Sequence, residues 1–154
     1  DRIPRKPAKH DNARTPLQWD DGPNAGFTSG TPWIQVNPNY PQINVQAALA
    51  DPDSIFYHYQ KLIRLRKQHL GLVYGAYELL LPEHAQIYAY TRTWEEERYL
   101  VILNFSAETP IFEAPEELAF EGAVLLISNY PVEDGEELRR LALRPYEARV
   151  YQLK

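Results

Sequence analysis

The chain of 154 residues is long enough for one ordinary domain, or for a small domain joined to part of another. Its net charge of -5 disfavours a nucleic-acid or anionic-membrane partner. The absence of cysteine excludes a disulfide framework, a thiolate metal site and a cysteine nucleophile. No apolar run approaches the roughly 18 residues of a membrane helix, so we expect a soluble, cytoplasmic protein.

Residues 1–50 are rich in turn formers and show no regular period, apart from a short turn around Val45–Ala50. Asn24-Ala25-Gly26 and Asn37-Pro38-Asn39-Tyr40 both predict turns. The segment nevertheless carries large apolar side chains that are costly to leave in water: Trp19, Phe27, Trp33, Ile34, Val36, Tyr40 and Ile43. A structureless stretch of this length indicates an incomplete domain, so we expect these loops to pack on a scaffold outside the chain. The alternative is that they wrap around the second half of the same chain.

One helix is predicted over Asp53–Gln68. Asp51-Pro52 is typical of a helix start, with a carboxylate at the N-cap and proline at the first helical position. Apolar groups follow at helical spacing, namely Ile55, Tyr59, Leu62, Ile63 and the stem of Arg66. Either Gly71 or Gly75 ends the helix.

Beyond Gly75 the hydrophobic period falls to two, which predicts short strands separated by turns or charge clusters. The predicted strands are Ala76–Leu81, Gln86–Thr93, Tyr99–Asn104, Pro110–Ala114, Val124–Asn129, Leu138–Leu143 and Ala148–Leu153. Short strands at this spacing are typical of an antiparallel β-sandwich. The predicted fold class is therefore mainly β, with the β-sandwich at the C-terminal end, preceded by loops and one helix.

The polar residues offer no catalytic constellation. Acidic runs fall in or beside predicted turns, where we expect them to face water: Asp20-Asp21, Glu95-Glu96-Glu97, Glu116-Glu117 and Glu136-Glu137. The four histidines lack a metal-ligand spacing, so we expect no metal site and no cofactor: His10, His58, His69 and His84. Five tyrosines at predicted strand positions could stack on sugars, but core or cross-strand packing is the better explanation: Tyr88, Tyr90, Tyr99, Tyr146 and Tyr151.

One segment is too particular for a generic loop. It runs from His10 to Asp21 as His-Asp-Asn-Ala-Arg-Thr-Pro-Leu-Gln-Trp-Asp-Asp. The resemblance continues in Asn24–Thr28, Pro32–Ile34, Val36–Tyr40, Tyr99–Ser106 and Arg144–Ala148. These stretches resemble bacterial α-glucosidases of glycoside hydrolase family 13, in the α-amylase superfamily, with oligo-1,6-glucosidase and trehalose-6-phosphate hydrolase as the most similar groups.

In that family a (β/α)8 barrel binds substrate at its C-terminal mouth, and a β-sandwich follows the barrel. A barrel takes about 250 residues, so the resemblance implies that this chain holds only the end of one. Residues 1–71 would supply mouth loops and the last barrel helix, and residues 72–154 the C-terminal β-sandwich domain. The catalytic carboxylates of the retaining mechanism would lie upstream. The resemblance therefore implies that this chain has no catalytic residue and that its partner is the missing barrel of the same enzyme.

Arg14, in the stretch Asp-Asn-Ala-Arg-Thr-Pro, is the one candidate site residue. It resembles the family's arginine at the floor of the pocket for the non-reducing glucose. A guanidinium can fork onto a carboxylate while its other donors face sugar hydroxyls. The resemblance thus implies substrate binding, and the alternative is that Arg14 only anchors its loop through an ion pair.

The resemblance implies a parent enzyme that hydrolyses α-glucosidic bonds with retention, with α-1,6 bonds in short isomaltooligosaccharides favoured. Two alternatives stay open at this point. The parent could be a trehalose-6-phosphate hydrolase, in which case the basic residues Arg5, Lys6 and Lys9 could favour a phosphorylated disaccharide, although a solvated loop end explains them as well. The chain could also be a stand-alone, non-catalytic β domain that binds carbohydrate or another subunit.

Overall fold

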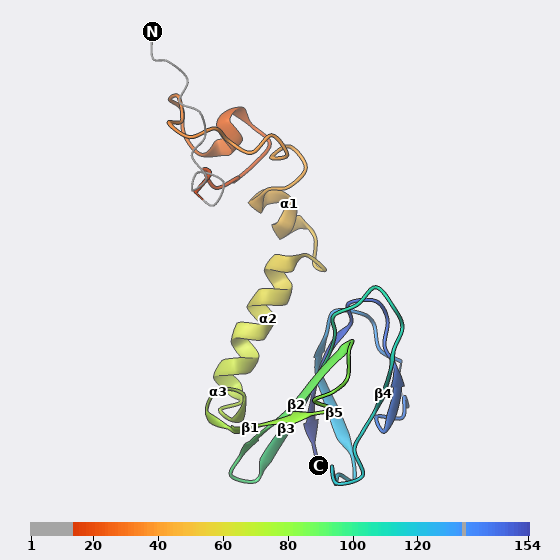
Figure 1. Cartoon of the computed structure of the whole chain (residues 1–154). Coiled ribbons are helices and arrows are strands. Elements are labelled where there is room, and N and C mark those ends of the chain that lie inside the picture. Colours follow the sequence, from red (N-terminus) through yellow and green to blue (C-terminus); the bar gives the residue numbers. More distant parts are fainter. Residues whose placement is uncertain (1–13, 134) are drawn as a thin grey trace. The chain divides into compact units, whose positions relative to one another are not determined.

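The computed structural model describes residues 14–133 and 135–154, and the chain divides into two compact units, Asp1–Tyr59 and Gln60–Lys154 (Figure 1). The helical elements are η2 Pro23–Gly26, α1 Val45–Ala50, α2 Ile55–Gln68 and α3 Gly71–Tyr74. The strands are β1 Ala76–Leu80, β2 Ile87–Trp94, β3 Glu97–Asn104, β4 Ile111–Glu113, β5 Ala123–Ser128, β6 Arg140–Ala142 and β7 Ala148–Leu153. None of the helices in the described part of the chain has the length and apolar character needed to cross a membrane.

From Arg14 onward, the first unit consists mainly of turns before α1, as its proline and glycine content predicts. The two predicted turns are confirmed by backbone hydrogen bonds, from the Phe27 N–H to the Asn24 carbonyl (3.1 Å) and from the Tyr40 N–H to the Asn37 carbonyl (3.2 Å). The short turn expected around Val45–Ala50 is helix α1. Its N-cap is Asn44, whose side chain accepts a hydrogen bond from the Ala47 N–H at 2.7 Å.

Helix α2 begins at Ile55, slightly later than predicted. Asp51 does not cap it, because its carboxylate accepts from the Asp53 N–H (2.9 Å) and its carbonyl from the Ser54 N–H (3.1 Å), which closes a separate turn. The helix ends at Gln68, and the single-turn helix α3 follows it before Gly75.

The second unit confirms the predicted antiparallel β fold. All seven predicted strands are present within a residue or two of their expected bounds, and they form a five-stranded sheet of order β1-β2-β3-β7-β5 and a two-stranded sheet of β4 and β6. Every pairing is antiparallel. Figure 1 shows the β4 layer standing beside one face of the larger sheet.

The hydrophobic core lies between these two layers. It draws alternate residues from the larger sheet and from β4, β6 and their flanking loops: Leu80, Ile87, Ala89, Leu100, Ile102, Phe112, Leu118, Leu138, Leu141, Leu143, Tyr151 and Leu153. The strand alternation visible in the sequence therefore selects the buried face correctly.

Candidate functional site

Arg14, the candidate substrate-binding residue, is the first residue that the structure describes, and its side chain is exposed. The preceding part of its motif, up to residue 13, lies outside the described residues. Directly after Arg14, a set of hydrogen bonds orders the chain. The Gln18 side-chain amide donates to Asn39 Oδ1 at 3.0 Å and also to the Ile43 carbonyl, while the Gln18 carbonyl accepts from the Val45 N–H at 2.9 Å.

The stretch from Trp19 to Gly30 forms a tight loop built on side-chain to backbone bonds. Asn24 and Ala25 adopt positive φ angles of 54° and 56°, and Ala25 is fully buried. The Asn24 amide donates to the carbonyls of Thr28 (3.1 Å) and Gly30 (2.9 Å). This loop keeps its shape by hydrogen bonding and not by an apolar core.

Most of the large apolar side chains in the described part of the first unit are exposed, whereas Ile34, Val36 and Tyr40 are half-buried. The most exposed are Trp33 (84%), Ile55 (82%), Tyr59 (64%) and Ile43 (63%), and five more are about half exposed: Leu17, Trp19, Phe27, Leu49 and Phe56. Apolar area of this extent is costly in water and marks a contact surface.

Of the three histidines in the described residues, His69 and His84 make structural hydrogen bonds. The His84 ring Nδ1 accepts from the Gln86 and Ile87 N–H groups, at 3.2 and 2.9 Å, and so closes the turn before β2. The His69 ring lies 3.1 Å from the Tyr99 hydroxyl, measured from Nδ1. His10 lies outside the described residues. In the described part of the chain, no three His, Asp or Glu side chains gather in a way that could hold a metal ion.

Two members of the acidic runs, Glu136 and Glu97, make specific contacts besides facing water: Glu136 is exposed and Glu97 is half-buried. Glu97 lies in β3 and accepts from the Tyr99 hydroxyl at 2.7 Å. The Glu136 carboxylate forms an ion pair with Arg149, which is only 2% exposed. The carboxylate of this otherwise exposed loop residue is thus paired with a buried cation, which needs a counter-charge.

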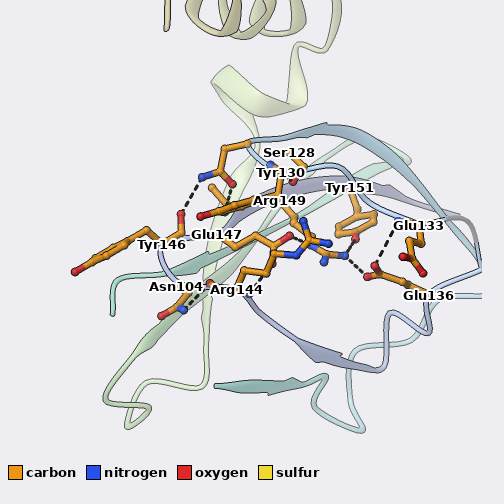
Figure 2. Close-up of polar contacts among 12 residues, drawn as sticks. Asn104, Ser128, Tyr130, Glu133, Glu136, Arg144, Tyr146, Glu147, Arg149 and Tyr151 are labelled. Carbon is orange, nitrogen blue, oxygen red and sulfur yellow. Dashed lines mark hydrogen bonds and ion pairs between the residues drawn. The ribbon is translucent and has the colours of Figure 1, made fainter. Parts of the chain in front are cut away.

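Arg149 is the centre of a polar cluster that we did not predict. Its Nε donates to Glu147 Oε1 at 2.8 Å, its Nη1 donates to the Tyr151 hydroxyl at 3.1 Å, and the same Nη1 pairs with Glu136. Figure 2 shows Arg149 between the carboxylates of Glu147 and Glu136. The second oxygen of Glu147 accepts from the Arg144 N–H at 2.7 Å. Glu147 is fully buried, so each of its oxygens has a partner inside the protein.

A signal for this cluster was present in the sequence. Glu147, Arg149, Tyr151 and Leu153 alternate along and just before β7, so they belong to one face of the strand, and Leu153 is apolar. A charged pair on a core-facing register predicts a buried ion pair, because an unpaired charge there would be too costly.

The cluster has a structural and not a catalytic arrangement. Burial lowers the pKa of Arg149, but its hydrogen bonds to Glu136, Tyr151 and Glu147 outweigh that effect and leave this pKa raised. The same hydrogen bond from Arg149 lowers the pKa of Glu136. Both carboxylates are thus engaged by one guanidinium, whereas acid–base catalysis needs carboxyl groups free to face a substrate.

The lowered pKa of Glu136 predicts acid sensitivity of the second unit. In the unfolded chain this carboxyl regains its ordinary pKa of 4.5. Near that pH the unfolded chain therefore binds more protons than the folded chain. The stabilising contribution is therefore fully present above that value and is lost as the pH falls through the lower, folded pKa. We expect the free energy of unfolding, measured with urea between about pH 6 and about pH 3, to fall less steeply in Glu136→Gln than in the parent chain.

The matched control is Glu113→Gln, which removes a carboxylate from an exposed pair with Arg140 at 3.2 Å. That pair is screened by water, so its loss should leave the pH profile almost unchanged. If the free energy of unfolding of the parent chain and of Glu136→Gln fell equally with pH, a lowered pKa of Glu136 would be contradicted.

Tyrosine positions are confirmed in part. Tyr99 and Tyr151 are buried, and Tyr88 and Tyr90 lie on β2 with their rings 5.4 Å apart. Tyr146 is not in a strand, which corrects the prediction. It has a φ of 55° and is 61% exposed, in the turn before β7 that the Asn129 side chain holds through the Tyr146 carbonyl at 2.9 Å.

Comparison with known proteins supplies the family. The model of the α-amylase catalytic domain matches residues 2–75, and the model of the maltogenic amylase C-terminal domain matches residues 77–150. The chain is 58% identical over 144 residues to an oligo-1,6-glucosidase of Parageobacillus thermoglucosidasius, covering 94% of this chain and 26% of that protein. It is 46% identical over 145 residues to a trehalose-6-phosphate hydrolase of Bacillus subtilis, covering 93% and 26%.

Solved structures agree with these matches. The crystal structure of Bacillus licheniformis trehalose-6-phosphate hydrolase matches with a TM-score of 0.87 and 46% identity, over 94% of this chain and 26% of that one. The chain spans about a quarter of the length of these relatives. Two adjoining family matches that run from residue 2 to residue 150, with relatives this similar, leave one assignment: the chain belongs to glycoside hydrolase family 13, the α-amylase family.

Proposed function

We propose that this chain is the C-terminal part of a retaining α-glucosidase that hydrolyses α-glucosidic bonds, with α-1,6 bonds in short isomaltooligosaccharides favoured. The observation that carries the proposal is the 58% identity to an oligo-1,6-glucosidase across both matched domains, against 46% to the trehalose-6-phosphate hydrolase of Bacillus subtilis. Residues 1–71 would complete the catalytic barrel, and residues 72–154 would form the C-terminal β-sandwich domain. A cytoplasmic location is part of the same proposal.

The catalytic carboxylates would come from the rest of the enzyme. Retaining glycosidases use two carboxyl groups about 5–5.5 Å apart across the scissile bond. Among the described residues, Glu136 and Glu147 are both bound to Arg149. We therefore propose no catalytic role for any described residue.

The partner we propose is the remaining part of the catalytic barrel. The exposed apolar side chains of the first unit support this proposal, among them Trp33 at 84% and Ile43 at 63%. Hydrogen bonds order the loops that carry them, so these residues form a prepared contact surface and not a disordered tail. No nucleic-acid or membrane partner is proposed, and the oligosaccharide substrate would be bound by the completed enzyme.

Arg14 would bind the non-reducing glucose in that enzyme. We expect Arg14→Lys to lower kcat/KM for isomaltose about ten- to a hundredfold, because lysine keeps the charge but loses the fork of donors. The variant belongs in a hybrid enzyme in which this chain replaces its 144-residue counterpart in the Parageobacillus thermoglucosidasius protein. The control is Arg140→Lys, a change at an exposed pair on β6. An Arg14→Lys hybrid with unchanged kcat/KM would show that Arg14 only anchors its loop.

The same hybrid tests the substrate. We expect the hybrid to keep the ratio of kcat/KM for isomaltose to kcat/KM for trehalose 6-phosphate that the Parageobacillus protein shows. A ratio shifted toward trehalose 6-phosphate would favour the second candidate, a trehalose-6-phosphate hydrolase, which the TM-score of 0.87 to such an enzyme keeps open. The Parageobacillus protein itself is the reference, since the hybrid differs from it only in the exchanged quarter.

A further inference from the structure

The segment that joins Arg14 to Gln18 is short and has little backbone freedom. Three residues lie between them, and the second of these is Pro16, whose ring fixes its φ. Thr15 precedes the proline, so its backbone is restricted to extended conformations. Pro16 is also buried. The position of Gln18 therefore limits where the backbone of Arg14 can lie.

Gln18 is bound to one later segment through both its side chain and its backbone. The side-chain amide donates to Asn39 Oδ1 at 3.0 Å and to the Ile43 carbonyl. The Gln18 carbonyl accepts from the Val45 N–H at 2.9 Å. We call the two side-chain bonds, to Asn39 and Ile43, the Gln18 clasp.

The segment that receives the clasp is braced by hydrogen bonds of its own. The Asn39 carbonyl accepts from the Ile43 N–H at 2.9 Å, and the Asn37 side chain accepts from the Asn39 N–H at 3.2 Å. The Asn44 side chain donates to the Tyr40 carbonyl at 2.8 Å. Because the acceptors of the clasp are themselves held in place, they give the Gln18 amide a fixed position.

The clasp also keeps the chain that follows Arg14 against the start of α1. The first N–H groups of a helix have no partner within it, and here two of them bond outside the helix. The Val45 N–H donates to the Gln18 carbonyl and the Gln46 N–H to the Trp19 carbonyl, each at 2.9 Å. The protection of these two N–H groups thus reports whether the segment after Arg14 stays in place.

We propose that Gln18 is a positioning residue for Arg14, whose clasp holds the guanidinium where it meets the non-reducing glucose. The proposal rests on the proposed function, because Arg14 meets a substrate only in the completed enzyme. A guanidinium binds through a fork of donors with fixed geometry, so a displacement of about 1 Å is enough to weaken binding. Gln18 acts through Arg14 and touches no substrate itself.

Steady-state kinetics of the hybrid carrying Gln18→Met tests the positioning. Methionine keeps the length of the side chain and removes both donated bonds. We expect the KM for isomaltose to rise about three- to tenfold while kcat changes less than about twofold, because a displaced Arg14 binds glucose less well. A lower kcat with an unchanged KM would indicate only a loss of folded enzyme and would overturn the proposal, as would unchanged kinetics.

The Arg14→Lys hybrid gives a second measurement. If Gln18 acts through the fork of Arg14, then Gln18→Met should lower kcat/KM by less than about twofold once that fork is gone, since changes at one shared contact are not additive. An equal loss with and without Arg14→Lys would mean that the two residues act independently, which overturns the proposal.

Asn129→Ala is the matched control. The Asn129 amide also bridges two segments, donating to the Tyr146 carbonyl at 2.9 Å and accepting from the Ala148 N–H at 2.8 Å, but it belongs to the second unit. Its loss should lower the Tm of the hybrid and leave the KM unchanged. A rise in KM equal to that of Gln18→Met would show that any weakened bridge has this effect, and the positioning role would fall.

Amide hydrogen exchange, followed by NMR, tests the clasp without relying on activity. In the 154-residue chain, Gln18→Met should speed exchange of the Val45 and Gln46 N–H groups severalfold. The Ala48 N–H, bonded within the first turn of α1 to the Asn44 carbonyl at 3.0 Å, should keep its rate. Equal exchange at all three positions in the parent chain and the variant overturns the proposal. Activity of the unaltered hybrid separately decides the proposed function, so the two failures are distinguishable.

Discussion

Replacing Arg149 by methionine is expected to lower the free energy of unfolding of the second unit by about 3–5 kcal/mol. The change leaves the carboxylate of the fully buried Glu147 with the Arg144 N–H as its remaining partner, at 2.7 Å. Water cannot solvate a buried charge that has lost its counter-ion. The resulting desolvation cost is larger than any gain from the apolar methionine. Urea unfolding followed by circular dichroism measures the effect.

The matched control for this prediction is Arg140→Met. Arg140 also pairs with a glutamate, Glu113, but the two side chains are 65% and 71% exposed. Its loss should cost about 1 kcal/mol or less. A second variant, in which both Glu147 and Arg149 become methionine, should recover much of the stability because no buried charge is left. If Arg149→Met and Arg140→Met lower the free energy of unfolding equally, burial does not explain the contribution of the Arg149 cluster to stability.

Phe112→Ala is expected to destabilise the second unit by about 3–5 kcal/mol. Phe112 is fully buried and pairs with Leu141 across β4 and β6, so its ring fills the space between the two layers. Removing it takes away the burial of the ring and leaves a cavity that the neighbouring leucines can fill only in part. The measurement is again urea unfolding, with the change in midpoint and slope recorded together.

Ile111→Ala is the control for Phe112→Ala, because it changes the preceding residue of the same strand. Ile111 is 44% exposed, so its truncation should cost about 1 kcal/mol or less. Similar losses for the two variants would mean that β4 and β6 do not close the core, and the two-layer description of this unit would be wrong.

Much of the second unit could be predicted because apolar residues alternate with polar or exposed ones along its strands. The alternation of Ile87, Ala89 and Thr91 with exposed or half-buried neighbours identifies both the strand and its core face. The start of α2 was less predictable, because Asp51 can cap a helix or close a local turn, and the same side chain serves either purpose. Tyr146 was misplaced because a strand-forming residue type sits in a positive-φ turn, which no local pattern indicates.

The site was harder to predict than the fold. The role of Arg14 rests on its sequence motif, which runs from Asp11 to Pro16. The pairing of Glu136 with Arg149 joins residues 13 positions apart, from a loop and a strand, so it depends on tertiary packing. The loops of the first unit keep their form through bonds such as Gln18 to Asn39, 21 residues apart, which hydrophobic periodicity cannot reveal.

The most direct test of the account is hydrolysis of p-nitrophenyl α-glucoside by the purified chain and by the hybrid, with the intact mass checked in each sample. We predict no hydrolysis at the mass of the 154-residue chain and clear hydrolysis by the hybrid, because the catalytic carboxylates would come from the other three quarters of the enzyme. Activity that follows the mass of the chain alone would contradict the account, and so would a folded but inactive hybrid.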